Sequence, residues 1–263
     1  DARGLVVAPG FINMLSWANE SLIHDGRSQS DIRQGVTLEV LGEGTSMGPL
    51  NEKMKRDRGN RQDEARYEIE WTTLGEYLEW LVKRGISTNV ASFVGATTVR
   101  IHEIGYENRP PTPQELERMR SLVRQAMQEG AVGISTSLIY SPAFYASTDE
   151  LIALAEVAAE YDGLYISHIR NEGDRIFEAL DELLTIARNA KIRAEVYHIK
   201  ASGRRNWDKI DEVFRRIEAS RAEGLAITAD MYPYHASSTG LDAIMPPWVQ
   251  EGGHSAWVER LRD

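Results

Sequence analysis

Short apolar runs alternate along this chain with longer stretches whose apolar residues recur at helical spacing. An apolar run of about four to eight residues is typical of a buried strand, whereas a period near 3.6 predicts a helix with one apolar face. Regular alternation of the two predicts a parallel sheet with helical crossovers, which is an α/β fold. Seven runs predict strands, at residues 5–12, 37–41, 89–94, 131–135, 164–167, 193–197 and 226–229.

The stretches between these runs carry helix start signals. Thr112 stands before Pro113, which suits the first helical position, and Ser147 followed by Glu150 predicts a capping box. The charged residues 51–70 are predicted to form a solvated loop or helix between the second and third strands. Two apolar helix faces comprise Leu116, Met119, Leu122, Val123, Ala126 and Met127, and Ile176, Ala179, Leu180, Leu183, Leu184 and Ala187.

Seven strands are one fewer than a closed (β/α)8 barrel needs, although 263 residues match the usual length of about 250 for this fold. We therefore predict an incomplete TIM-like barrel that forms a single partial domain over residues 1–263, with the eighth strand outside the chain. The chain begins with Asp1 rather than Met, and residues 4–10 already resemble a strand. We expect it to be a piece of a longer protein.

Composition narrows the possible partners and ligands. The formal net charge of −10 argues against nucleic acid and anionic membrane surfaces, which favour a basic face, so a small-molecule substrate is expected. No run reaches the roughly 18 apolar residues of a membrane span. The chain has no cysteine, so any zinc must be held by imidazole and carboxylate, and a cytoplasmic location is compatible with this composition.

His168 and His198 each follow a predicted strand and are separated by one strand-helix unit. Because the carboxyl ends of neighbouring parallel strands meet at one mouth of a barrel, two imidazoles so placed can reach the same metal. The alternative is that each is a hydrogen-bonded histidine of the barrel rim. The matched pair favours metal binding.

A catalytic zinc usually has three protein ligands, and Glu43 is the best candidate for the third. It follows the second strand between Gly42 and Gly44, which allow a sharp turn over the barrel mouth. The alternative is an ion pair with a rim arginine. Two residues beyond His198, Lys200 lies on the same strand face and is a candidate cationic anchor for substrate, whereas Arg170 could orient substrate or neutralise Glu43 or Glu172.

Several motifs together resemble the D-aminoacylase, or N-acyl-D-amino-acid deacylase, family of the amidohydrolase superfamily. The resemblance covers nearly the whole chain, and the motifs are specific only in combination. They are VAPGFI (7–12), GVT (35–37), GEGTSMGP (42–49), GISTSLIYSP (133–142), SHIRNEG (167–173), YHIKASG (197–203) and DMYPYHASST (230–239).

The resemblance implies a metallo-dependent hydrolase barrel, with a flanking β-sandwich lying mostly outside this chain. It implies one zinc on Glu43, His168 and His198, with Glu43 at the position of the family's cysteine ligand. Leu15 and Trp17 stand at the family's His-x-His position in the first strand, so a second ion is not expected. Trp17 would either wall the pocket there or serve as packing.

The same resemblance implies that Tyr232 and Ser238 hydrogen-bond the substrate carboxylate, with ordinary loop packing as the alternative. It also implies an aspartate base after the eighth strand, so these residues alone are expected to be inactive. The function expected of the whole protein is hydrolysis of an N-acyl-D-amino acid to a carboxylate and a D-amino acid by a zinc-activated water. The alternatives are hydrolysis of another linear or cyclic amide and a non-catalytic barrel that binds a small ligand or partner.

Overall fold

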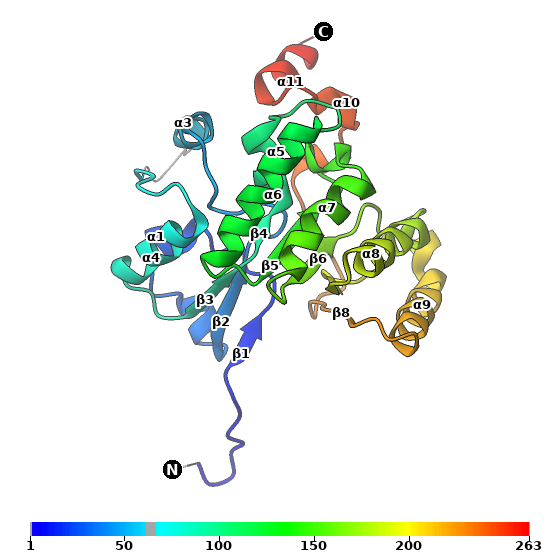
Figure 1. The fold of residues 1–263 in the computed structure, drawn as a ribbon. Coiled ribbons are helices and arrows are strands. Elements are labelled where there is room, and N and C mark those ends of the chain that lie inside the picture. Colours follow the sequence, from blue (N-terminus) through cyan, green and yellow to red (C-terminus); the bar gives the residue numbers. More distant parts are fainter. Residues whose placement is uncertain (1, 62–66, 263) are drawn as a thin grey trace.

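The computed structural model describes residues 2–61 and 67–262, and its strands all pair in parallel (Figure 1). One sheet has the order β1-β2-β3 and the other β4-β5-β6-β7-β8. The predicted α/β barrel architecture is confirmed. The strands are β1 (Phe11–Asn13), β2 (Val36–Leu41), β3 (Asn89–Ser92), β4 (Val94–Gly95), β5 (Gly133–Ser137), β6 (Leu164–His168), β7 (Arg193–Val196) and β8 (Ile227–Ala229).

The predicted strand at residues 89–94 is interrupted at Phe93. Its first part, β3, pairs with β2, and its second part, β4, pairs with β5. The main-chain N–H of Phe93 still donates to the Leu41 carbonyl at 3.0 Å, so the break is local. One continuous run therefore joins the two sheets, and the eight labelled strands correspond to seven strands of a barrel.

Helices connect successive strands and cover the outside of the sheets, as Figure 1 shows for α6, α7 and α8. Long helices follow the predicted apolar faces. The helices are α1 (Ser21–His24), α2 (Gln29–Ile32), α3 (Glu52–Arg61), α4 (Leu74–Arg84), α5 (Ala96–Glu103), α6 (Pro113–Gln128), α7 (Thr148–Ala159), α8 (Ile176–Ala190), α9 (Ile210–Ala222), α10 (Pro247–Gln250) and α11 (His254–Arg260). Short 3-10 helices occupy Ala143–Tyr145, Arg204–Lys209 and Leu241–Ile244.

The two predicted helix starts differ in their caps. At α6, Thr112 and Glu115 form the full reciprocal capping box. At α7, Ser147 Oγ accepts from the Glu150 N–H at 3.2 Å, but the return bond predicted from Glu150 is absent. The Glu150 carboxylate instead pairs with the buried Arg100 of α5 at 2.5 Å, because a buried guanidinium requires an anionic partner.

Two apolar layers hold the barrel. The larger cluster lies between strands and helices, whereas a smaller cluster of Val40, Phe93, Ile166 and Tyr197 brings together the inward faces of four barrel strands. Successive side chains of a strand point to opposite faces, so each strand serves both layers. The inner cluster fills the barrel and leaves the carboxyl ends of the strands to form the mouth.

The first predicted strand is too long at its amino end. Leu5, Val6 and Val7 are 72%, 92% and 84% exposed, and pairing in the described structure begins at Phe11, whose N–H donates to the Gly35 carbonyl. An apolar run alone does not make a strand without a neighbour to pair with. The eighth strand and the β-sandwich stay predictions about sequence outside these residues.

The charged stretch predicted between the second and third strands contains α3. Met54 of this helix is buried, so the helix has an apolar contact as well as a solvated face. Residues 62–66 of the same stretch lie outside the described residues. Among the described helices, none combines the length and the apolar character needed to cross a membrane.

Candidate metal centre

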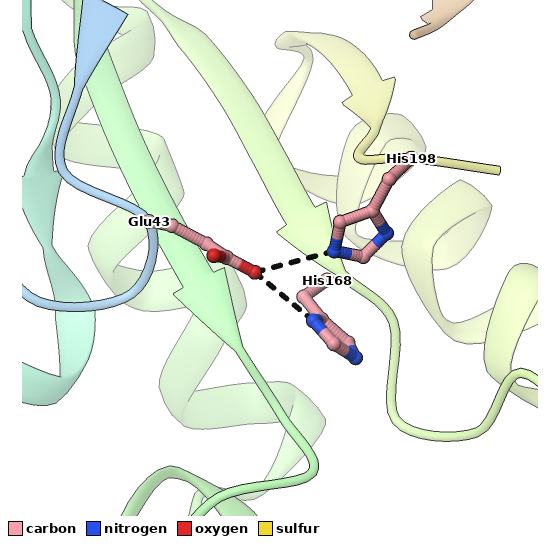
Figure 2. A group of neighbouring side chains, drawn as sticks. All are labelled: Glu43, His168 and His198. Carbon is pink, nitrogen blue, oxygen red and sulfur yellow. Dashed lines mark hydrogen bonds and ion pairs between the residues drawn. The ribbon is translucent and has the colours of Figure 1, made fainter. Parts of the chain in front are cut away.

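Glu43, His168 and His198 converge on one point at the barrel mouth (Figure 2). Oε1 of Glu43 lies 3.0 Å from Nδ1 of His168 and 3.3 Å from Nε2 of His198. The three side chains are only 5%, 7% and 10% exposed. The structure thus brings together all three predicted ligands, and Glu43 contacts the two imidazoles rather than a rim arginine.

The backbone around Glu43 requires glycine on both sides. Gly42 and Gly44 have φ of +101° and +64°, in the region that disfavours other residues. A Cβ on Gly44 would lie 2.5 Å from the Cβ of Ser137, and one on Gly42 would lie 2.6 Å from the Phe93 carbonyl oxygen. The Gly44 N–H donates to Ser135 Oγ at 3.0 Å, which fixes the turn against β5. This close approach directs the carboxylate of Glu43 toward the histidines.

The two histidines are held by their strands in different ways. His168 ends β6 and is paired in register with Ser137 of β5. His198 follows β7 with φ of +37°, an unusual conformation for a residue with a side chain. Its N–H donates to Oδ1 of Asp230 at 2.5 Å, and the Asp230 carbonyl accepts from the Ile199 N–H at 2.9 Å. Asp230, which follows β8, therefore holds the turn that presents His198.

Burial and hydrogen bonding have opposite effects on the pKa values of Glu43 and His198. Burial would raise the pKa of Glu43, but hydrogen bonds from His168 and His198 outweigh it and lower that pKa to about 2. Burial would lower the pKa of His198, but hydrogen bonds to Glu172 and Glu43 outweigh it and raise that pKa to about 9. At neutral pH without metal, Glu43 is an anion and His198 a cation.

A second carboxylate lies on the other side of the imidazoles. Oε1 of Glu172 is 3.1 Å from Nδ1 of His198 and 2.5 Å from Nζ of Lys200. Burial would raise the pKa of Glu172, but the hydrogen bond to His198 and the charges of His168 and Lys200 lower it. The nitrogen atoms facing Glu172 are those that do not face Glu43.

A cavity of about 610 Å³ opens onto the three convergent side chains. Lys200, Tyr232 and Ser238 all line it, as their predicted role requires. Leu15 and Trp17 line it too, and Trp17 is 71% exposed, so Trp17 walls the cavity rather than packing in the core. Further rings on the wall come from Tyr140 and Tyr234.

Arg170 is not among the residues that line this cavity. Its guanidinium binds Glu182 at 2.8 Å and the carbonyl oxygens of Phe144 and Ala146. The structure therefore gives Arg170 a place on the outer rim, where it pairs with neither Glu43 nor Glu172. The offset of two residues after His168 did not place it on the cavity, because the chain leaves β6 after His168 and the strand alternation no longer applies.

The convergent atoms fit one zinc ion. The candidate ligand atoms all lie within 4.8 Å of one another, and they are the imidazole and carboxylate donors that zinc accepts. Tetrahedral zinc with bonds of about 2.0–2.1 Å places its ligand atoms roughly 3.3 Å apart, close to the two separations measured from Glu43. The ionised Glu43 is already in its ligand form.

Two residues of the site were missed as site residues by sequence reasoning. In the sequence, Glu172 is recognised only as a possible partner of Arg170, and Asp230 only as the first residue of the motif at 230–239. Each follows a strand of the mouth, Glu172 after β6 and Asp230 after β8, which was the available signal. Their contacts with His198 span 26 and 32 residues of sequence and depend on the folded turn.

Comparison with known proteins places this geometry in context. No protein-family model matches the chain. It is 35% identical to the D-aminoacylase of Alcaligenes xylosoxydans xylosoxydans over 92% of its own length and 50% of that protein's. The chain spans about half the length of the curated relatives it matches.

Two solved structures have the same fold. One is a crystal structure of D-aminoacylase, with a TM-score of 0.78 and 31% identity over 86% of this chain and 48% of the other. The second is the N-acyl-D-glutamate deacylase of Bordetella bronchiseptica complexed with zinc and a phosphonate mimic of the tetrahedral intermediate, with a TM-score of 0.81 and 32% identity over 89% and 49% of the two chains. In sequence and in fold, this chain belongs to the D-aminoacylase, or N-acyl-D-amino-acid deacylase, family of amidohydrolases.

Proposed function

We propose that the protein hydrolyses the amide bond of an N-acyl-D-amino acid, with one zinc ion held by Glu43, His168 and His198. The observation that carries this proposal is the convergence of these three side chains on the floor of a cavity at the barrel mouth. Bound zinc would lower the pKa of a water toward neutrality and polarise the scissile carbonyl. The products are a carboxylate and a D-amino acid.

Residues of the cavity supply substrate binding in this proposal. Lys200 offers an ammonium to the amino-acid carboxylate, while the hydroxyls of Tyr232 and Ser238 donate hydrogen bonds to it. Lys200 retains Glu172 as its other partner, which limits the movement of its long side chain. The general base that the resemblance implies, an aspartate after an eighth strand, stays a prediction about sequence outside these residues.

Zinc content and hydrolysis together test the proposal. The protein expressed from its complete gene is expected to contain one zinc per chain and to hydrolyse the D- but not the L-enantiomer of an N-acetyl-amino acid. His168→Ala and His198→Ala are expected to lose both zinc and activity. Unchanged zinc content in both variants would refute the ligand assignment, and equal rates on both enantiomers would refute the stereochemical part.

A non-catalytic barrel is the second candidate, and Leu15 and Trp17 favour it. These apolar side chains line the cavity where the family places a His-x-His pair, which removes the ligands of a second ion. In that case the zinc-loaded protein would bind an N-acyl-D-amino acid without turnover, and calorimetry with product analysis separates the two outcomes. Hydrolysis of another linear or cyclic amide is recognised by the same product analysis. A cytoplasmic location stays a prediction from composition.

A further inference from the structure

We propose that Glu172 is a positioning residue that fixes the proton positions of both histidine ligands. This inference rests on the metal centre of the proposed function. It assigns a role to Glu172, which lies on the opposite side of the two imidazoles from Glu43. Glu43 faces one nitrogen of each imidazole, Nδ1 of His168 and Nε2 of His198. Glu172 faces the opposite nitrogen of each, at 3.1 Å from Nδ1 of His198 and 3.8 Å from Nε2 of His168.

An imidazole that binds metal through one nitrogen carries its proton on the other, and that N–H needs an acceptor. For His198 the acceptor is Glu172, already within hydrogen-bond distance. Nε2 of His168 is buried and has no hydrogen-bond partner among the described residues. Oε1 of Glu172 lies 3.8 Å from this nitrogen, and a movement of roughly 1 Å would bring the two within hydrogen-bond distance.

The position of Lys200 explains why His198 needs the carboxylate of Glu172. Its Nζ lies 2.9 Å from Nδ1 of His198 and can only donate. A donation to Nδ1 would require the proton of the neutral ring to be on Nε2, the nitrogen that faces Glu43, and would block metal binding there. Glu172 draws the ammonium to itself at 2.5 Å and accepts from Nδ1, so it favours the tautomer whose Nε2 lone pair is free.

The chain offers a matched control for this role. Glu182 is 13% exposed and pairs with Arg170 at 2.8 Å, while Glu172 is 12% exposed and pairs with Lys200. Among the described residues, the hydrogen bonds of Glu182 are with Arg170 and Thr148 and not with either imidazole. Substitution of either glutamate therefore removes a largely buried carboxylate from an ion pair. Only substitution of Glu172 also removes a contact with the histidine ligands.

Zinc affinity and imidazole proton signals test the inference in the protein expressed from its complete gene. Glu172→Ala is expected to weaken zinc binding by about 10–100-fold, as is usual when the partner of a metal-bound histidine is lost. Glu172→Gln keeps an acceptor oxygen and is expected to lose less, while Glu182→Gln leaves the zinc dissociation constant unchanged. In the zinc-loaded wild type, proton NMR is expected to show exchange-protected imidazole N–H signals that Glu172→Ala loses.

Each contrary result has a distinct meaning. Wild-type zinc affinity and N–H signals in folded Glu172→Ala would overturn the inference, as would a loss in Glu172→Gln as complete as that in His168→Ala, since Glu172 would then be a ligand. If Glu172→Ala does not fold, wild-type zinc affinity and N–H signals in Glu172→Leu, whose side chain of similar size offers no acceptor, would overturn it. If His168→Ala binds zinc like the wild type, the metal centre of the proposed function fails instead.

Discussion

At the scale of single residues, the site depends on the two glycines that flank Glu43. Gly44 combines a φ of +64° with a near contact, because a Cβ there would lie 2.5 Å from the Cβ of Ser137. Gly105 has a φ of +76° and open space around the same position. A comparison of Gly44 with Gly105 therefore separates two effects. Both glycines relieve backbone strain, but only Gly44 also avoids a steric contact with β5.

We predict that Gly44→Ala destabilises the protein by about 2–4 kcal/mol and displaces Glu43, so that zinc binding weakens as well. Gly105→Ala is expected to lose only the strain energy, about 1 kcal/mol, with normal zinc affinity. Urea unfolding and zinc titration of both variants check this. Equal effects of the two substitutions would show that packing against Ser137 does not position Glu43.

His198 gives the metal-free protein a dependence on pH. The pKa of this imidazole is raised in the folded protein from its ordinary value of 6.5 to about 9. Its stabilising contribution is therefore fully present below pH 6.5 and is lost as pH rises through about 9.

We predict that the free energy of unfolding of the metal-free wild type falls by on the order of 2 kcal/mol between pH 6.5 and about 9 on account of this group. His198→Asn removes the group and should show a correspondingly smaller fall. Urea unfolding at the two pH values, with a chelator present, measures the difference. Parallel pH profiles of wild type and variant would contradict the assignment.

At the scale of elements, α5 and α7 are joined by the buried pair of Arg100 and Glu150. The two side chains are 1% and 3% exposed, and Arg100 also donates to the carbonyl oxygens of Glu107 and Arg109, which follow α5. Removal of one partner leaves a charge that is buried and uncompensated.

We predict that Glu150→Gln costs about 3–5 kcal/mol of unfolding free energy, with the larger part due to the unpaired guanidinium. The double variant Arg100→Met with Glu150→Gln should recover part of that loss, because the buried charge is then gone. Urea unfolding of the single and double variants measures both effects. A double variant no more stable than Glu150→Gln alone would contradict this account.

The pair of Arg100 and Glu150 also shows which features of a helix can be predicted from sequence and which cannot. The start of α7 followed from Ser147, whose contacts are local, and Ser147 does cap the helix. The predicted return bond from Glu150 failed because a residue 50 positions away competes for the carboxylate. Likewise, the run at residues 89–94 was recognised, but its interruption at Phe93 arises where one strand must pair with two sheets.

At the scale of the whole molecule, the barrel brings together at one mouth site residues that are spread over about 200 residues of the sequence. His168 and His198 were predictable because strand ends of a parallel sheet converge. Glu43 required the further inference that glycines allow its turn. The contacts of Glu172 and Asp230 with His198, and the outer position of Arg170, were not predictable, because each depends on loops that have already folded.

In the proposed site, one zinc ion binds to Glu43, His168 and His198. Anomalous diffraction at the zinc edge, from crystals of the zinc-loaded protein, would locate this ion. We predict one peak at the barrel mouth, about 2.0–2.2 Å from Oε1 of Glu43, Nδ1 of His168 and Nε2 of His198. A map with no peak between these three atoms, or with the zinc bound by other residues, would contradict the claim.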